Sequence, residues 1–357
     1  MVRRQLRDVA VVSFSQSDVV RDVGAVNEVE LIMPVIRQAL DQAGLSSVQD
    51  LDFTCSGSCD YLQGAAFAFV TGVDALGAVP PIKESHVEMD AAWALYEAWL
   101  KIQMGQADSA LLFGFGKSSP GELPSVLSLQ LDPYYLQPLW PDSISLAALQ
   151  ARAMLDNGDI TEADMAAVVA RSRRNAMSNP HAQLAGQYSA TNLLAEPMYL
   201  SPLRKHDLCP VSDGAAAMVI CTVEKAEEWG LPFARISGID HRIETHNLGA
   251  RDLTRSVSTE IAAEKAGVGA GPVEIAEIYA PFSHQEVLLT RALGLGAATE
   301  INPSGGVLAG NPMMAAGLSR IGEIAMRIIQ GDAKRGVAHA TSGPCLQQNM
   351  VVVLEGA

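Results

Sequence analysis

Glycines gather in residues 302–317, which read NPSGGVLAGNPMMAAG. Glycine tolerates positive φ and allows close approach to a ligand, and a helix starting near Pro312 would point free N–H groups back at this loop. The stretch predicts a site for an anion or a carbonyl oxygen. A tight turn that packs a helix on a sheet is the alternative. The candidate ligand contacts are its glycines and one on a later, similar turn: Gly305, Gly306, Gly310 and Gly343.

Thiols are the second group of residues able to do chemistry. The chain has five: Cys55, Cys59, Cys209, Cys221 and Cys345. An odd number in a large chain without secretory features predicts reduced cysteines. Cys55 and Cys59 lack a second pair at zinc-ribbon spacing, so we interpret them as small buried residues and expect no metal site.

Length and composition limit the class of protein. The 357 residues suffice for two domains or two halves with substantial cores, and a content of 48% hydrophobic and 18% charged residues indicates a globular chain. A net charge of −15 excludes the basic stripe that nucleic-acid binding requires. No apolar run is long enough to span a bilayer, and the N-terminal apolar segment is too short for a signal peptide. A cytoplasmic location is the default expectation.

The order of predicted elements occurs twice, which indicates an α/β chain with an internal duplication. In the first half we predict strands at 8–14, 51–55, 109–115 and 215–221, and helices at 28–43 and 89–104. In the second half we predict strands at 234–239, 275–280, 336–341 and 350–355, and helices at 256–266 and 313–329. The halves would be residues 1–231 and 232–357.

The first half carries an additional block at about 118–210. It is rich in proline and then contains predicted helices at 143–156 and 162–177. Long insertions in compact folds are often lids or binding loops, so we expect this block to cover the substrate. Its apolar residues fit a large acyl chain or a subunit interface: Tyr134, Tyr135, Leu136, Leu139 and Trp140. Residues 171–174, RSRR, suggest either contacts to CoA phosphates or a solvated helix face.

Three motifs carry a resemblance to a known family: VSDGAAA at 211–217, AEIYAPFSHQEVLLTRALGLG at 276–296 and INPSGGVLAGNP at 301–312. Together with the duplication, they make the chain similar to the thiolase superfamily, especially its sterol-carrier or lipid-transfer type. The resemblance implies a five-layered αβαβα thiolase fold and acyl-CoA ligands. It also implies a homo- or heterodimer built along the sheet edge and, for some members, a small OB-fold and zinc-ribbon partner protein.

The chain departs from the thiolase pattern at the residues that carry the chemistry. Aligned on the resemblance, residues 88–91, Glu-Met-Asp-Ala, occupy the place of the nucleophilic cysteine. Asn311 replaces the G-H-P histidine, and Tyr279 replaces the histidine of the E-x-H-D-C-F stretch. The late catalytic cysteine corresponds to Gly343 or, two residues away, to Cys345. A carboxylate cannot perform acyl transfer through a thioester, so ordinary thiolysis is not expected.

The leading hypothesis from this resemblance is retro-aldol cleavage of a steroid-like β-hydroxyacyl-CoA. Asn311 as a donor and the backbone amides near Gly343 would hold the thioester oxygen as it becomes an enolate. Proton transfer would fall to Tyr279, His284 and Glu88, whose pKa burial would raise. The thioester carbonyl is itself the electron sink, so no bound cofactor is required beyond the CoA that the substrate carries.

Each of these residues also has a structural interpretation. Glu88 would favour a helix dipole, and Tyr279 would fill the core. His284 would cap a helix or lie exposed at the surface, and Asn311 would cap its helix. Cys345 is either a reactive thiol or a small packing residue. Two other functions therefore stay open: a non-catalytic thiolase-like subunit that binds a catalytic homologue or the OB-fold partner, and a thiolase with a displaced cysteine.

Overall fold

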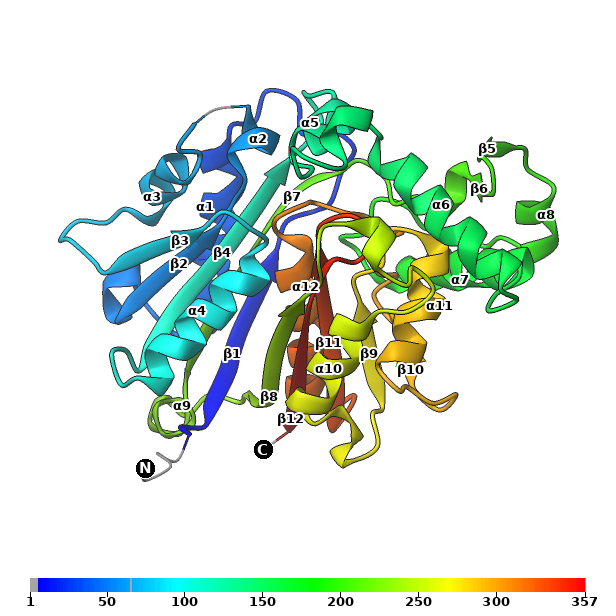
Figure 1. Cartoon of the computed structure of the whole chain (residues 1–357). Helices are drawn as coiled ribbons and strands as arrows, with labels where there is room; N and C mark the ends of the chain where they lie inside the picture. The colour runs from blue at the N-terminus through cyan, green and yellow to red at the C-terminus, as the bar shows by residue number, and fades with distance from the viewer. Residues whose placement is uncertain (1–5, 65, 357) are drawn as a thin grey trace.

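The computed structural model describes residues 6–64 and 66–356 (Figure 1). Ten of its strands form one sheet in the order β10-β9-β11-β12-β8-β1-β7-β4-β2-β3. The first half of the chain supplies β1 (Val9–Gln16), β2 (Phe53–Gly57), β3 (Glu84–Val87), β4 (Ser109–Lys117) and β7 (Asp213–Thr222). The second half supplies β8 (Ala234–Ile243), β9 (Ile275–Ile278), β10 (Glu300–Ile301), β11 (Arg335–Ser342) and β12 (Gln348–Gly356).

The two halves of the sheet repeat one topology. β4 lies between the parallel strand β2 and the antiparallel strand β7, and β11 lies in the same way between β9 and β12. They join where β1 pairs antiparallel with β8, from Val9 opposite Ile236 to Val11 opposite Ala234. The duplicated α/β arrangement predicted from the sequence is therefore confirmed. The division at about residue 231 falls between the end of α9 (Val223–Trp229) and the start of β8.

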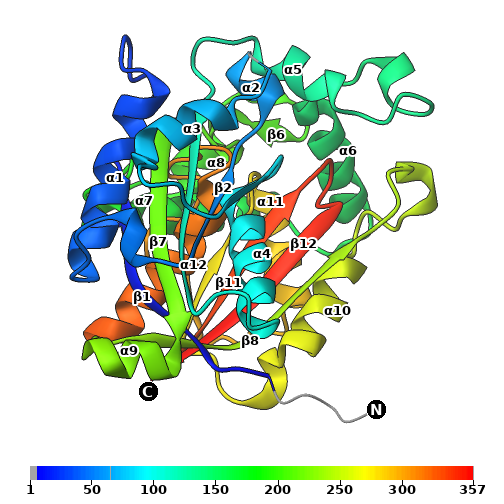
Figure 2. The ribbon, with the colours of Figure 1, turned by 90° about the vertical axis from the view of Figure 1, so that its left-hand side faces the viewer.

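Helices form three layers around the two half-sheets. α4 (Ala91–Gln103) and α12 (Ala316–Gln330) lie in the middle, where they contact each other and strands of their own halves, and α12 also reaches β1 and β7. α1 (Glu28–Gln42), α3 (Phe69–Leu76) and α9 cover one outer face, and α10 (Val257–Ala266) and α11 (Ser283–Ala292) cover the other. Figure 2 shows α1 and α10 on opposite flanks of the molecule. This is the αβαβα layering expected from the resemblance.

Local sequence explains why these elements form. In α1, apolar side chains at helical spacing from Leu31 to Leu40 are buried against the sheet. Asn27 and Glu30 form a capping box at its start, and Gly44, with φ of +66°, follows its end. β1, β7 and β12 are almost entirely buried, as expected for apolar strands between helical layers.

The insertion extends from the first half across one end of the second (Figure 1). It contains α5 (Leu123–Leu129), α6 (Ser143–Asp156), α7 (Glu162–Asn175), α8 (Ala190–Leu194) and a ribbon of β5 (Met198–Leu200) and β6 (Leu203–Arg204). α7 packs on α11 and on α8. A short helix, α2 (Asp60–Gln63), lies beside α5. Among the described residues, no helix combines the length and apolar character needed to cross a membrane.

One predicted boundary was wrong in a way that affects the site. The central helix expected from residue 313 begins at Ala316, because Met314 has φ of +73° and the Ala315 N–H bonds to the Pro312 carbonyl. The Met314 carbonyl instead accepts a hydrogen bond from the Ala91 N–H at 2.8 Å. The turn before α12 is therefore tied to the start of α4.

Candidate functional site

Tyr279 is the centre of a buried polar cluster at the carboxyl end of β9. Its side chain is 4% exposed, and burial raises its pKa well above the usual value. The charge of Asp90 acts in the same direction, whereas Arg320 and the Asn311 amide oppose it. Tyr279 is thus a protonated phenol near neutral pH, a hydrogen-bond and proton donor. The Asn311 side chain lies within hydrogen-bonding reach of Tyr279.

Asn311 is held beside Tyr279 by an extended segment of the insertion. The Asn311 N–H donates to Ser212 Oγ at 2.9 Å, and its Nδ2 donates to Cys209 Sγ at 3.2 Å. Cys209 is fixed in turn because its own N–H donates to the Pro281 carbonyl at 2.8 Å. Desolvation raises the pKa of Cys209 to about 11, so the sulfur is a thiol near neutral pH.

Cys209 was missed as a site residue by the sequence analysis. Isolated β-bridges pair Leu208 with Phe282 and Ser212 with Pro312, which places residues 208–212 against both other parts of the cluster. Its only signal in the sequence is its position two residues before the VSDGAAA motif. Nothing in that spacing shows which loop it faces.

Asp90 caps the start of α4 and lies in residues 88–91, the segment that the resemblance aligns with the family's cysteine motif. Its carboxylate accepts hydrogen bonds from the N–H groups of Ala92 (2.9 Å), Gly317 (2.9 Å) and Leu318 (3.1 Å). Burial raises its pKa, against these N–H groups and the charge of Arg320. One carboxylate therefore takes up the free N–H groups of both central helices. The expectation that the first turn of α12 offers N–H groups to a ligand was wrong.

The glycine-rich loop is packed rather than open. The N–H groups of Gly305, Gly306 and Gly310 donate to Asn302 O, Ser304 Oγ and Val307 O respectively. Gly305 and Gly306 have φ of +96° and +64°, and added Cβ atoms would meet Ala176 and Asn302 within 3 Å. These three glycines therefore allow a tight turn against the insertion, and their amides are not free to hold an oxygen.

Gly343 differs from the other three glycines. It begins the turn between β11 and β12, with φ of +76°, and Cys345 follows with φ of +51°. Arg251 donates to the carbonyls of Pro344 (3.1 Å) and Cys345 (2.6 Å). Among the backbone hydrogen bonds outside helices and strands in residues 6–64 and 66–356, none engages the N–H of Gly343 or Cys345. That these amides hold an oxygen stays a prediction.

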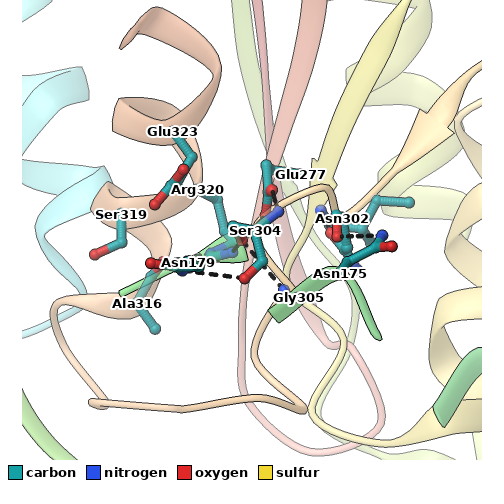
Figure 3. A network of polar contacts seen from close by, with 12 residues as sticks. Asn175, Asn179, Glu277, Asn302, Ser304, Gly305, Ala316, Ser319, Arg320 and Glu323 are labelled. Carbon is teal, nitrogen blue, oxygen red and sulfur yellow. Dashed lines mark hydrogen bonds and ion pairs between the residues drawn. The ribbon is translucent and has the colours of Figure 1, made fainter. Parts of the chain in front are cut away.

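A buried ionic network anchors the loop that leads to Asn311 (Figure 3). The Glu277 carboxylate accepts hydrogen bonds from the N–H and Oγ of Ser304, both at 2.8 Å, and pairs with Arg320. Asn179 Nδ2 of the insertion donates to the Ser304 carbonyl at 3.0 Å. Asn302 Oδ1 accepts from the Ile278 N–H at 2.6 Å, one residue before Tyr279. The same contacts thus fix the loop, the insertion and the end of β9.

Three predicted residues lie outside this cluster. Glu88 is exposed, and its carboxylate accepts a hydrogen bond from the Asp60 N–H at 2.6 Å, so the expectation of burial was wrong. His284 is fully buried at the start of α11, with Nε2 3.3 Å from Gln150 Oε1, and burial lowers its pKa to about 3. The His284 imidazole therefore stays neutral near pH 7. It neither caps α11 nor lies at the surface, so both structural interpretations from the sequence were wrong.

Cys345 lies against the insertion. Its Sγ donates to the Leu146 carbonyl at 3.4 Å, in an apolar cluster with Leu131 and Leu136, and burial raises its pKa to about 12. These contacts fit the packing interpretation. In the RSRR run, Arg171 pairs with Glu286 and Arg173 donates to the Leu308 carbonyl, so both have structural partners.

Comparison with known proteins finds similarity to thiolases, although no family model matches the chain. It is 27% identical to an acetyl-CoA acetyltransferase of Methanothermobacter thermautotrophicus, over 95% of each chain. It is 27% identical to the benzoylsuccinyl-CoA thiolase subunit BbsB of Thauera aromatica, over 57% of this chain and 60% of that subunit. It is 24% identical to sterol carrier protein 2 of Rattus norvegicus, over 77% of this chain and 57% of that protein. The last two matches span less than two thirds of the relatives' length.

Solved structures show the same fold. Human mitochondrial 3-ketoacyl-CoA thiolase superposes with a TM-score of 0.80 at 17% identity, over 99% of this chain and 100% of that one. The structure described as the Ltp2-ChsH2(DUF35) aldolase superposes with a TM-score of 0.80 at 18% identity, over 98% of each chain. The chain therefore has the thiolase fold, and its sequence is similar to thiolases and to sterol carrier protein 2.

Proposed function

We propose that the chain is a carbon–carbon lyase that cleaves a bulky, steroid-like β-hydroxyacyl-CoA by a retro-aldol reaction. The observation that carries this proposal is the buried pair of Tyr279 and Asn311 near the Asp90 carboxylate, at a helix start whose residues 88–91 contain no thiol. The site keeps groups that bind oxygen and move protons. At the start of α4 it lacks the nucleophile that acyl transfer requires.

The reaction needs one base, one electron sink and one acid. The β-hydroxyl gives its proton to the base, the Cα–Cβ bond breaks, and its electron pair moves to the thioester oxygen, forming an enolate. The enolate then takes a proton at Cα, which leaves a carbonyl product and a shortened acyl-CoA. No electrons are gained or lost overall, and the CoA arrives with the substrate.

The pKa directions divide the acid and base roles. Tyr279, with its raised pKa, holds a proton and is the acid that protonates Cα. Asp90 is the base, because burial makes its carboxylate more basic and its charge acts directly on Tyr279. A carboxylate offers about four lone-pair positions, and backbone N–H groups fill three of those of Asp90. The resemblance makes the backbone amides near Gly343 the proposed donors to the enolate oxygen.

Two other functions have their own support. One relative is named as a subunit, BbsB, and one similar structure is named for two components, Ltp2 and ChsH2(DUF35), which supports the alternative of a subunit that binds a catalytic homologue or an OB-fold and zinc-ribbon partner. The insertion also exposes apolar side chains that suit a partner or an acyl chain: Tyr134, Tyr135, Leu139 and Trp140. A thiolase with Cys345 as nucleophile has less support, because burial keeps that sulfur a thiol.

The test is Tyr279→Phe, which removes the acidic proton and keeps the ring. We expect turnover of a steroid-like β-hydroxyacyl-CoA to fall by about 10²-fold or more, with unchanged urea unfolding. The matched control is Glu88→Gln, whose exposed carboxylate lies outside the cluster, and it should stay within about twofold of the wild-type rate. Equal rates for wild type and Tyr279→Phe would refute the role of the phenol.

A further inference from the structure

The side-chain amide of Asn311 is hydrogen-bonded on one side only. Asn311 is 6% exposed, and its Nδ2 donates to Cys209 Sγ. Its Oδ1 is buried and finds no donor in the part of the chain that the structure describes. A buried carbonyl oxygen without a donor costs free energy, which a ligand recovers by supplying an N–H or O–H group.

The neighbours of Asn311 explain why this oxygen stays unpaired. The Ser212 hydroxyl accepts from the Asn311 N–H and donates its own proton to Gln183 Oε1 at 2.6 Å. It therefore has no proton to offer to Oδ1. Cys209 is held by its bond to Pro281 and presents its sulfur to Nδ2, which fixes which end of the amide faces the cluster.

We propose that Asn311 Oδ1 accepts a hydrogen bond from the β-hydroxyl group of the bound substrate before that proton passes to the base, and that Cys209 is the positioning residue that sets this polarity. The inference rests on the proposed lyase function and names the group that recognises the β-hydroxyl of its substrate. A β-oxo group offers only lone pairs and would face another acceptor. The role expected for Asn311 from the sequence, a donor to the enolate oxygen, is thereby replaced.

The test compares three CoA thioesters that differ only at the β-carbon: 3-hydroxybutyryl-CoA, acetoacetyl-CoA and butyryl-CoA. Each is titrated calorimetrically into the full chain at pH 7, and mass spectrometry confirms that the thioester is intact afterwards. We expect the hydroxy compound to bind about tenfold more tightly than either of the others, the factor that one additional hydrogen bond supplies.

Cys209 variants test the positioning role through this ratio rather than through activity. In Cys209→Ala the Asn311 amide loses the acceptor that orients it, so the affinities for 3-hydroxybutyryl-CoA and acetoacetyl-CoA should differ by no more than about twofold. Cys209→Ser restores an acceptor, so this variant should retain the preference for the hydroxy compound. The matched control is Cys221→Ala, which removes a buried thiol elsewhere in the sheet. Cys221 lies in β7, opposite Ala10 of β1 and Ser109 of β4, and its loss should leave the ratio of the binding constants unchanged.

Equal or tighter binding of acetoacetyl-CoA by the wild type would overturn the inference, as would an unchanged ratio in Cys209→Ala. Failure of the proposed function looks different. Preferential binding of the hydroxy compound without cleavage of any β-hydroxyacyl-CoA refutes the lyase and leaves the recognition of the hydroxyl intact. Cleavage of a β-hydroxyacyl-CoA without preferential binding of the hydroxy compound supports the lyase and refutes the role of Asn311 Oδ1.

Discussion

Substitution of Gly116 by alanine tests how the site is held in place. Gly116 lies in β4, where the turn before α12 crosses the strand, and an added Cβ would stand 2.0 Å from the Met313 carbonyl oxygen. Real Cβ contacts do not fall below 3.0 Å, so the carbonyl must move by 1.0 Å, the difference between 3.0 and 2.0. Because Gly116 does not have a positive φ, the effect is steric alone.

The displacement sets the size of two effects. Overpacking of this kind lowers the free energy of unfolding by about 1–3 kcal/mol. Asn311 lies two residues before Met313, and a shift of about 1 Å in a positioning segment costs about 10²-fold in turnover. Urea unfolding at pH 7 measures the first effect, and the initial rate of β-hydroxyacyl-CoA cleavage measures the second.

Gly121→Ala is the matched control, since an added Cβ there meets nothing within 4 Å. It should change the free energy of unfolding by no more than about 0.5 kcal/mol and leave the rate unchanged. The reasoning is refuted if Gly116→Ala unfolds at the wild-type urea concentration and keeps the wild-type rate. In that case the turn adapts, and its position does not control the site.

Three further predictions concern groups around the cluster. Glu277→Gln should lower the free energy of unfolding at pH 7 by about 3 kcal/mol, because it leaves the buried Arg320 guanidinium without its closest partner; a loss below about 1 kcal/mol in urea would contradict this. Burial lowers the pKa of His284 to about 3 and of His339 to about 4, from the usual 6.5. Because the unfolded chain takes up these protons first, the free energy of unfolding has its full value above pH 6.5 and decreases as the pH falls toward the two lowered pKa values. Urea unfolding between pH 7 and 5 should show this loss, at up to about 1.4 kcal/mol per pH unit for each histidine, and His339→Gln should reduce the slope. Cys209, with its pKa raised to about 11, should react with iodoacetamide at pH 7.5 at least about tenfold more slowly than free cysteine, as followed by peptide mass spectrometry.

Much of the architecture follows from local sequence. Runs such as VAVVSF in β1 predict buried strands, and glycines that follow helices mark their ends, as Gly44 and Gly331 do with positive φ. The same elements recur in both halves, so their order predicts the repeated strand topology that the structure shows. These features depend on neighbours in the chain, which is why the sequence alone predicts them.

The site was only partly predictable, because its contacts join distant segments. Tyr279 and Asn311 followed from the resemblance, whereas Cys209 reaches them through β-bridges that no local pattern encodes. Asp90 takes up the N–H groups of Gly317 and Leu318, more than 200 residues away, so the free helix end that the sequence suggested is occupied. The exposure of Glu88 likewise depends on how β3 lies at the edge of the sheet.

The most direct test of the lyase is mass spectrometry of the CoA products. The purified chain is incubated, with and without candidate partner proteins, with a steroid-like β-hydroxyacyl-CoA and separately with the corresponding β-ketoacyl-CoA plus free CoA. The proposed function predicts a shortened acyl-CoA and a carbonyl product from the hydroxy substrate, with no requirement for free CoA. Cleavage of only the keto substrate would identify a thiolase, and no product in any mixture would identify a non-catalytic subunit; either result contradicts the lyase.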